Sequence, residues 1–379
     1  MSGNFPQKIL IIRLSSMGDI VLVSAFVRQL RARFPAAEIH FLVGKRFKEI
    51  VEFNPHLSKI IEYDHSLKRA GILAFKSEFL KTLPFKKYDI VIDLQRNLRS
   101  WEFRRGIAKK VLKIHKARFE KIMLVRFKKN LFKNIPIAGR YRQTAAELGV
   151  EDDGKGLEIW LPGESKKENF ERKKEKVKSK NEFLKEDNGE FLKEIYPPDL
   201  KKQVTSHQSP VTKIAIAPGA HHFTKRWPWE KFAALAEILF KKYNCEIVLL
   251  GGAADRGICR NISAKISFKA IDKSGATSIF ETARELDKCD LLITNDTGVM
   301  HIAAARRIPV VAIFGSTVKE FGFAPFRVEN RVVEIVNLPC RPCTHIGRAE
   351  CPLGHFKCMN LIEPDAVLKS VEELFLKEN

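Results

Sequence analysis

Two charged side chains occupy short loops that follow predicted buried strands, where α/β proteins usually place reactive groups. Asp19 closes the loop 15–19 after the apolar run 8–14, and Lys225 follows the run 213–217. A carboxylate that is ionised at neutral pH can accept a proton from a hydroxyl. An ammonium group can neutralise negative charge that develops on a leaving group. These residue types predict proton abstraction in one loop and anion stabilisation in the other.

A third stretch, 291–304, predicts a strand, a tight turn and a helix in immediate succession. Asp296, Thr297 and Gly298 form the turn, so the free N–H groups and the positive end of the helix dipole point at one spot. This is a seat for a diphosphate, with the Thr297 hydroxyl as an extra donor. The alternative is that Asp296 or Thr297 only caps the helix, and Asp19 could likewise only cap the helix that follows it.

The elements that carry these loops alternate between apolar strands and amphipathic helices. The expected strands are 8–14, 38–44, 59–63 and 88–95 in the first half, and 213–217, 246–252, 270–272, 291–293 and 309–314 in the second. The expected helices are 20–34, 47–53, 229–243, 277–286, 299–305 and a closing helix 364–377. This alternation predicts an α/β protein with two doubly wound parallel sheets, whose ligand crevices lie beyond the carboxyl ends of the strands. No G-x-G-x-x-G follows the first strand, which argues against a nicotinamide oxidoreductase.

The positive charge is concentrated in the first half of the chain. The net charge is +22, and residues 1–150 hold 31 Lys and Arg against 12 Asp and Glu. Such a field favours nucleic acid, an anionic membrane surface or a phosphorylated substrate. Residues 96–142 carry 16 of these cations and two acids. We expect basic helices with an aromatic edge, suited to an anionic bilayer, or else solvated helix faces; no nucleic-acid-binding module is recognisable.

Large apolar side chains interleave with the cations of this basic stretch. They are Trp101, Phe103, Phe119, Phe127, Leu131 and Phe132.

Three parts are expected along the chain. Residues 1–163 form a basic first domain, 164–210 a Lys/Glu-rich linker or insertion, and 211–379 a second domain. No window of about 18 uninterrupted apolar residues occurs, and the early apolar run 9–12 is too short for a signal peptide. We therefore expect a cytoplasmic protein whose cysteines are not a disulfide framework.

Four of the seven cysteines gather in the segment 340–358: Cys340, Cys343, Cys351 and Cys358. The C-x₂-C pair followed by two further cysteines resembles a metal site, although the second spacing is wider than usual. Structural zinc, free thiols and a disulfide are the alternatives. Nothing in the sequence places this cluster near the reactive loops.

Three motifs in order, SSMGDI, PGA…KRWP and NDTGVMHIAAA, resemble those of glycosyltransferase family 9, the lipopolysaccharide heptosyltransferases. The resemblance implies the GT-B fold, in which two Rossmann-like domains face a cleft. It also implies inverting transfer of heptose from ADP-L-glycero-D-manno-heptose to the inner core on lipid A. A phosphorylated acceptor in an anionic leaflet would give the basic first domain a purpose, with the enzyme at the cytoplasmic face of the inner membrane and no nucleic acid as partner.

The same resemblance implies roles for individual residues. Asp19 corresponds to the catalytic base and Lys225 to the group that stabilises departing ADP. The donor side would comprise Asp296 at the sugar hydroxyls, Thr297 and Gly298 at the phosphates, and Thr224 and Gly219 nearby. His301 lies one turn into the helix, where it either faces the cleft or packs in the core. Gly18 and Ser16 would lie on the acceptor side. Ala220, His221 and His222 stand where some members have threonines, so the residues that touch the diphosphate are not fixed by the likeness.

The resemblance requires no bound cofactor, since no D-x-D motif follows a strand and magnesium would enter only with the donor. Two alternatives remain. One is a GT-B enzyme for another nucleotide sugar, either a transferase or an epimerase. The other is a non-catalytic nucleic-acid-binding protein, which would explain the charge but not the paired strand-end loops. Donor sugar, acceptor position and oligomeric state are not specified by the sequence.

Overall fold

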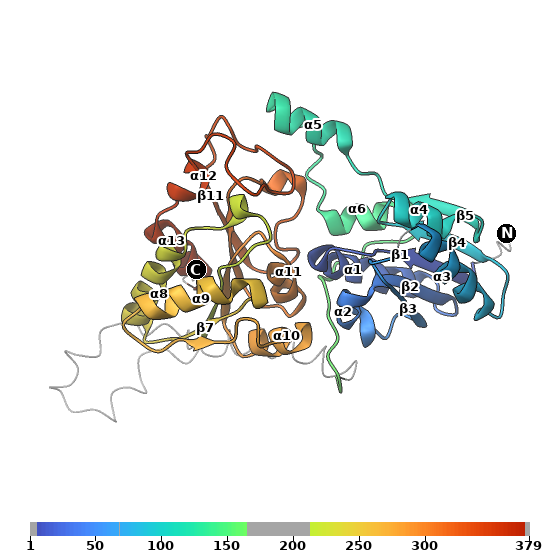
Figure 1. The fold of residues 1–379 in the computed structure, drawn as a ribbon, viewed down its shortest axis with the longest axis horizontal. Helices are drawn as coiled ribbons and strands as arrows, with labels where there is room; N and C mark the ends of the chain where they lie inside the picture. The colour runs from blue at the N-terminus through green and yellow to red at the C-terminus, as the bar shows by residue number, and fades with distance from the viewer. Residues whose placement is uncertain (1–5, 68, 165–212, 376–379) are drawn as a thin grey trace, which may run out of the picture.

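The computed structural model describes residues 6–67, 69–164 and 213–375, arranged as two α/β bodies (Figure 1). The expected linker 164–210 lies outside these residues except for Glu164. The two sheets fall on either side of it in the sequence, and the expected domain bounds stay a prediction. In the described parts of the chain, no helix combines the length and apolar character needed to cross a membrane.

The first body is built on a five-stranded parallel sheet in the order β3-β2-β1-β4-β5. Its strands are β1 (Lys8–Ile12), β2 (Glu38–Gly44), β3 (Lys59–Tyr63), β4 (Tyr88–Asp93) and β5 (Ala108–Lys113). Its helices are α1 (Met17–Arg33), η1 (Lys45–Phe47), α2 (Glu49–Glu52), α3 (Arg69–Lys81), α4 (Leu98–Arg104), α5 (Arg118–Phe127), α6 (Ile137–Gln143) and η2 (Ala146–Leu148). The strand order reverses between β1 and β4, which places the expected crevice beside the loop after β1.

The second body has a six-stranded parallel sheet in the order β11-β10-β9-β6-β7-β8. Its strands are β6 (Lys213–Ala217), β7 (Glu246–Leu249), β8 (Ile271–Asp272), β9 (Leu291–Asn295), β10 (Val310–Phe314) and β11 (Asn330–Glu334). Its helices are η5 (Phe223–Lys225), α8 (Trp229–Tyr243), η6 (Ala253–Asp255), α9 (Arg256–Lys265), α10 (Ile279–Asp287), α11 (Gly298–Ala305), η7 (Lys319–Phe321), α12 (Lys357–Asn360) and α13 (Pro364–Phe375). The switch point lies between β6 and β9, the two strands that precede the Lys225 loop and the Asp296 turn.

Alternating side chains of the strands build separate cores on the two faces of each sheet. Ile9 and Ile11 point to the face that α1 covers, whereas Leu10 and Ile12 join α3 and α4 on the opposite face. The core under α1 continues into the second body through the buried side chains of α11. Because α1 and α11 pack directly on each other, the two bodies share one apolar interior (Figure 1).

Most predicted elements are present, with bounds that differ by a few residues. β2, β3, β6 and α8 have the predicted bounds. The expectation of basic helices throughout 96–142 is wrong in one respect, because β5 lies inside that stretch. Its exposed lysines decorate an edge strand, where they prevent pairing with another chain. The closing helix α13 packs on α8 and β11 of the second body.

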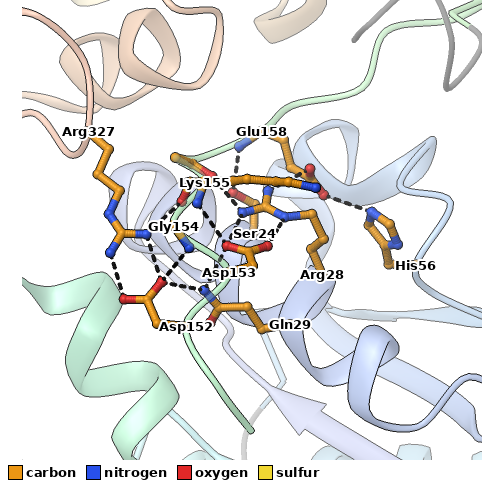
Figure 2. Close-up of polar contacts among 11 residues, drawn as sticks. Ser24, Arg28, Gln29, His56, Asp152, Asp153, Gly154, Lys155, Glu158 and Arg327 are labelled. Carbon is orange, nitrogen blue, oxygen red and sulfur yellow. Dashed lines mark hydrogen bonds and ion pairs between the residues drawn. The ribbon is translucent and has the colours of Figure 1, made fainter.

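Residues 152–164 lead out of the first body, and Arg28 of α1 binds the start of this outgoing segment (Figure 2). Its guanidinium donates to Asp153 Oδ2 at 2.6 Å, to Glu158 Oε2 at 2.8 Å and to the Gly156 carbonyl oxygen at 2.9 Å. Glu158 is buried, and His56 Nε2 lies 3.2 Å from its second oxygen. Burial alone would raise the pKa of Glu158, but His56 and Arg28 together lower it.

Two further arginines attach this outgoing segment to the second body. Arg327 donates hydrogen bonds from both terminal nitrogens to the two carboxylate oxygens of Asp152, at 2.7 and 2.6 Å (Figure 2). Arg306, at the end of α11, pairs with Glu164 at 2.7 Å and with Asp287 at 2.6 Å. The segment before the linker is therefore fixed to both bodies by charge-assisted hydrogen bonds.

Candidate active site

Asp19 lies in the first turn of α1, at the carboxyl end of β1 (Lys8–Ile12). Ser16 is the N-cap, so the expectation that the helix begins after Asp19 is wrong, as is the alternative that Asp19 itself is the cap. Ser16 donates its hydroxyl to Asp19 Oδ2 at 2.9 Å and its backbone N–H to the same oxygen at 3.3 Å. A carboxylate at this position is also stabilised by the helix dipole.

Two side chains from outside α1 hold the Asp19 carboxylate. An Arg13 terminal nitrogen lies 2.6 Å from Oδ2, and the Tyr141 hydroxyl donates to Oδ1 at 2.9 Å. Burial would raise the pKa of Asp19, but the Arg13 charge and the bonds from Tyr141 and Ser16 outweigh it and lower the pKa. Asp19 is thus ionised and fixed. Oδ2 has three donors, whereas Oδ1 accepts the Tyr141 hydroxyl and keeps a lone pair for one further donor.

Lys225 and Asp296 meet at the switch point of the second sheet. Lys225 ends η5, after β6, and Asp296 opens the turn after β9. Lys225 Nζ lies 2.6 Å from Asp296 Oδ2, which also accepts the Thr317 hydroxyl at 2.8 Å. Both charged side chains are largely buried, so the pair presents one ammonium group at a defined position.

Thr297 is the N-cap of α11, and its hydroxyl accepts the Val299 N–H at 3.2 Å. Thr297 therefore caps the helix, and its role toward a diphosphate stays a prediction. The cap still leaves backbone N–H groups of the first turn unused within the helix. Gly298 follows, and a Cβ there would lie 2.3 Å from Met17 Cε of α1. The glycine allows the N-terminus of α11 to approach that of α1.

His301 stands between the two halves of the site. It is buried, and a Cβ on Gly18 would lie 2.7 Å from its Cδ2. Burial lowers the pKa of His301 to about 4, although the charges of Asp296 and Asp19 act in the opposite direction. The imidazole is therefore neutral at physiological pH. Its Nδ1 is buried and has no hydrogen-bond partner among the described residues.

Three other expected site residues have structural partners. The Thr224 hydroxyl accepts the Arg348 N–H at 2.8 Å and the Ser316 hydroxyl at 3.0 Å. Gly219 lies against the Asp255 carboxylate, which leaves no room for a side chain. Ser16 caps α1, as described above. The structure therefore shows what each supports and does not test its role toward a substrate.

The four cysteines of the segment 340–358 line one pocket, together with Thr224 and Ser316. Phe223 also stacks on Phe356 of this segment, with ring centroids 4.8 Å apart. The expectation that nothing brings the cluster near the reactive loops is therefore wrong, since Thr224 directly precedes Lys225.

The four cysteines can serve as thiols or as metal ligands. None of these four cysteines forms a disulfide, and within the described residues no three potential ligands are grouped closely enough to hold a metal ion. Burial raises the pKa of the Cys358 thiol to about 12. Zinc stays a prediction.

Arg13, Tyr141 and Thr317 complete the site, and sequence reasoning missed all three. The role of Arg13 could have been predicted from the sequence, because this cation directly follows β1 and adjoins the loop that carries Asp19. Tyr141 and Thr317 had no sequence signal, because they meet their partners only through the fold.

The comparisons with known proteins agree with this geometry. The sequence model described as glycosyltransferase family 9 (heptosyltransferase) matches residues 77–353. The chain is 32% identical to lipooligosaccharide heptosyltransferase 2 of Campylobacter jejuni over 42% of its own length, and it spans about half the length of that relative (51%). It is 24% identical to lipooligosaccharide heptosyltransferase 2 of Haemophilus influenzae over 98% of its length and 100% of the relative's.

Solved structures share the fold. A glycosyl transferase of family 9 from Veillonella parvula superposes with a TM-score of 0.72 at 22% identity, covering 100% of this chain and 99% of that one. The Escherichia coli ADP-heptose lps heptosyltransferase II gives 0.63 at 20% identity, covering 98% and 99%. The predicted family and GT-B fold are confirmed: the chain belongs to glycosyltransferase family 9.

Proposed function

We propose that the protein is an inverting glycosyltransferase that moves a heptose from ADP-L-glycero-D-manno-heptose to a hydroxyl of the lipopolysaccharide inner core. The supporting relatives are heptosyltransferases by name, and two of them match along almost their whole length. The observation that carries the proposal is the meeting of two strand-end sites. Asp19 of one body and the Lys225–Asp296 pair of the other lie on either side of the α1–α11 contact.

On the acceptor side, Asp19 takes the proton of the attacking hydroxyl. The freed oxygen forms a bond to the anomeric carbon as the bond from that carbon to the diphosphate breaks, which inverts the centre. Arg13 and Tyr141 hold the carboxylate in place and keep it ionised before the reaction. The proton passes from Asp19 to solvent after the product leaves.

On the donor side, the departing ADP gains negative charge. Lys225 Nζ and the free N–H groups at the start of α11 meet that charge. Asp296 holds the ammonium and directs its remaining oxygen toward the sugar hydroxyls. The unpaired Nδ1 of His301 is available to the bound donor.

No bound metal takes part in the proposed transfer, and magnesium would arrive only with the donor. Zinc at the four cysteines is a separate proposal. Metal analysis of the purified protein tests it. About one zinc per chain supports the site. Absence of zinc together with four titratable thiols in the segment 340–358 refutes it.

We place the enzyme at the anionic cytoplasmic surface of the membrane that holds its acceptor. The net charge of residues 1–150 supports this location, because a phosphorylated lipid acceptor and its neighbours are anionic.

The first test is a calorimetric titration with ADP, UDP, GDP and NAD in parallel. Saturable binding of ADP alone supports an ADP-sugar donor. ADP-heptose and a purified lipid A–core acceptor then allow transfer to be followed by the mass of the product. Binding of UDP or GDP instead would discard the heptosyl donor. Binding of nucleic acid and of no nucleotide would overturn the enzyme assignment.

A further inference from the structure

The helix α5 (Arg118–Phe127) exposes large apolar side chains on consecutive turns. Phe119 is 64% exposed, Ile122 55% and Phe127 55%, and Leu131 just beyond the helix is 48% exposed. Single exposed apolar residues are common, whereas several on one short element form a patch that needs a partner. Figure 1 shows α5 at the outer edge of the molecule, apart from the sheet of the first body.

The other side of α5 is packed, which fixes the direction of this patch. Leu124 is buried against Val318 and Phe321 of the second body, and Phe132 stacks edge-on against Phe321 at 5.7 Å. Lys128 Nζ donates to the carbonyl oxygen of Pro342 at 2.7 Å. Since α5 is held from behind, the apolar patch is a built surface and not a helix that has failed to pack.

Cations surround the apolar patch. Between residues 118 and 133 the sequence has six Lys and Arg residues and one acid, Glu120. Arg118, Arg126, Lys129 and Lys133 are exposed. Apolar side chains that alternate with cations on one helix face are typical of elements that lie in the headgroup region of an anionic bilayer. A second copy of the chain is a poorer occupant, because the two patches would repel each other.

The inner side of α5 adjoins the acceptor half of the site. Burial and the nearby charges of Arg140, Lys116 and Arg13 lower the pKa of Lys121, whereas the charge of Asp19 raises it. The charge of Asp19 therefore reaches Lys121 of α5. A lipid whose sugar reaches Asp19 would have its acyl chains on the side where α5 is apolar.

We propose that residues 118–133 form a membrane-docking surface, which inserts Phe119, Ile122 and Phe127 among the headgroups of an anionic phospholipid bilayer. This surface would hold the first body, which carries Asp19, against the headgroups. The inference rests on the proposed function for its purpose, but docking itself requires no catalysis.

The test compares the full chain with the variant Phe119→Ser/Ile122→Ser/Phe127→Ser in flotation with two kinds of vesicle. One kind is phosphatidylcholine, and the other contains roughly one third phosphatidylglycerol. Val336→Ser is the matched control, because Val336 is also exposed but lies outside the patch. All three changed side chains are exposed, so equal thermal unfolding should confirm that the variant folds.

We expect the wild type and the control to float with anionic vesicles and to be released by salt. The triple variant should bind at least about ten-fold more weakly. Equal binding by the triple variant, or no binding of the wild type, overturns the proposal. The proposal is also overturned if the wild type binds an immobilised acidic protein under conditions where it does not bind the anionic vesicles.

Activity separates this inference from the proposed function. If the protein transfers heptose, the triple variant should show a raised KM for acceptor in vesicles and an unchanged KM for a deacylated, water-soluble acceptor. If the protein transfers no heptose, the vesicle-binding experiment still tests membrane docking by itself.

Discussion

Replacing Asp19 by asparagine separates proton abstraction from every other task of the site. The amide keeps the size of the side chain and an oxygen that can accept the Tyr141 hydroxyl, now at 2.9 Å. It loses the negative charge, and with it both the basicity and the ion pair with Arg13. The proposed donor contacts lie on the other body, so the substitution should not alter them directly.

The expected loss of turnover follows from the role of a general base. Such a group contributes roughly 10²–10⁴ in rate, or about 2.7–5.5 kcal/mol of transition-state stabilisation. We therefore expect kcat to fall by roughly that factor while the affinity for ADP is unchanged. Loss of the ionic partner of Arg13 should cost about 1–3 kcal/mol of unfolding free energy, which a stable domain tolerates.

Asp152→Asn is the matched control for this experiment. It breaks another aspartate–arginine pair with a shortest N–O distance of 2.6 Å, the one with Arg327, outside the site. Initial rates with ADP-heptose, calorimetry with ADP and thermal unfolding should be measured for both variants. A folded Asp19→Asn enzyme with turnover within about ten-fold of the wild type would refute the base assignment. Equal losses in both variants would show that the effect is one of folding.

Three further outcomes are expected. Lys225→Ala should weaken ADP binding, measured by calorimetry, because the diphosphate loses its facing ammonium; wild-type affinity would exclude that role. Tyr141→Phe should raise the pKa of Asp19 by removing a donor to the charged form, so the acid limb of the pH–rate profile should move to higher pH; an unmoved limb would contradict the contact. Arg28→Ala should cost about 3 kcal/mol in chemical denaturation, because it strands the buried Glu158 carboxylate. Since the folded-state pKa of Glu158 is lowered, its contribution should be full above its unfolded pKa and be lost as the pH falls through the folded value.

Strand ends were the most predictable part of the site. An apolar run followed by a loop and a helix places the intervening residues at the carboxyl edge of a parallel sheet. Asp19, Lys225 and Asp296 could therefore be chosen from the sequence. The pairing of Lys225 with Asp296 follows from a topology in which β6 and β9 are neighbours. What the sequence left open was which strands would be neighbours.

The parts that were missed depend on contacts between distant segments. Tyr141 reaches Asp19 across 122 residues, and Thr224 reaches Arg348 across 124. No local pattern encodes such pairs. β5 was missed for another reason: its lysines masked a short edge strand inside a stretch whose charge suggested helices.

The contact between α1 and α11 explains how two separate sheets can serve one reaction. Gly18 and Gly298 both lie where a side chain would collide with the opposite helix, so the two helix N-termini approach through their backbones. Asp19 lies within one turn of that contact in α1, and the proposed diphosphate seat lies within one turn of it in α11. The shared apolar core, to which the side chains of both helices belong, fixes this spacing. Transfer between an acceptor held by one body and a donor held by the other requires such a fixed distance.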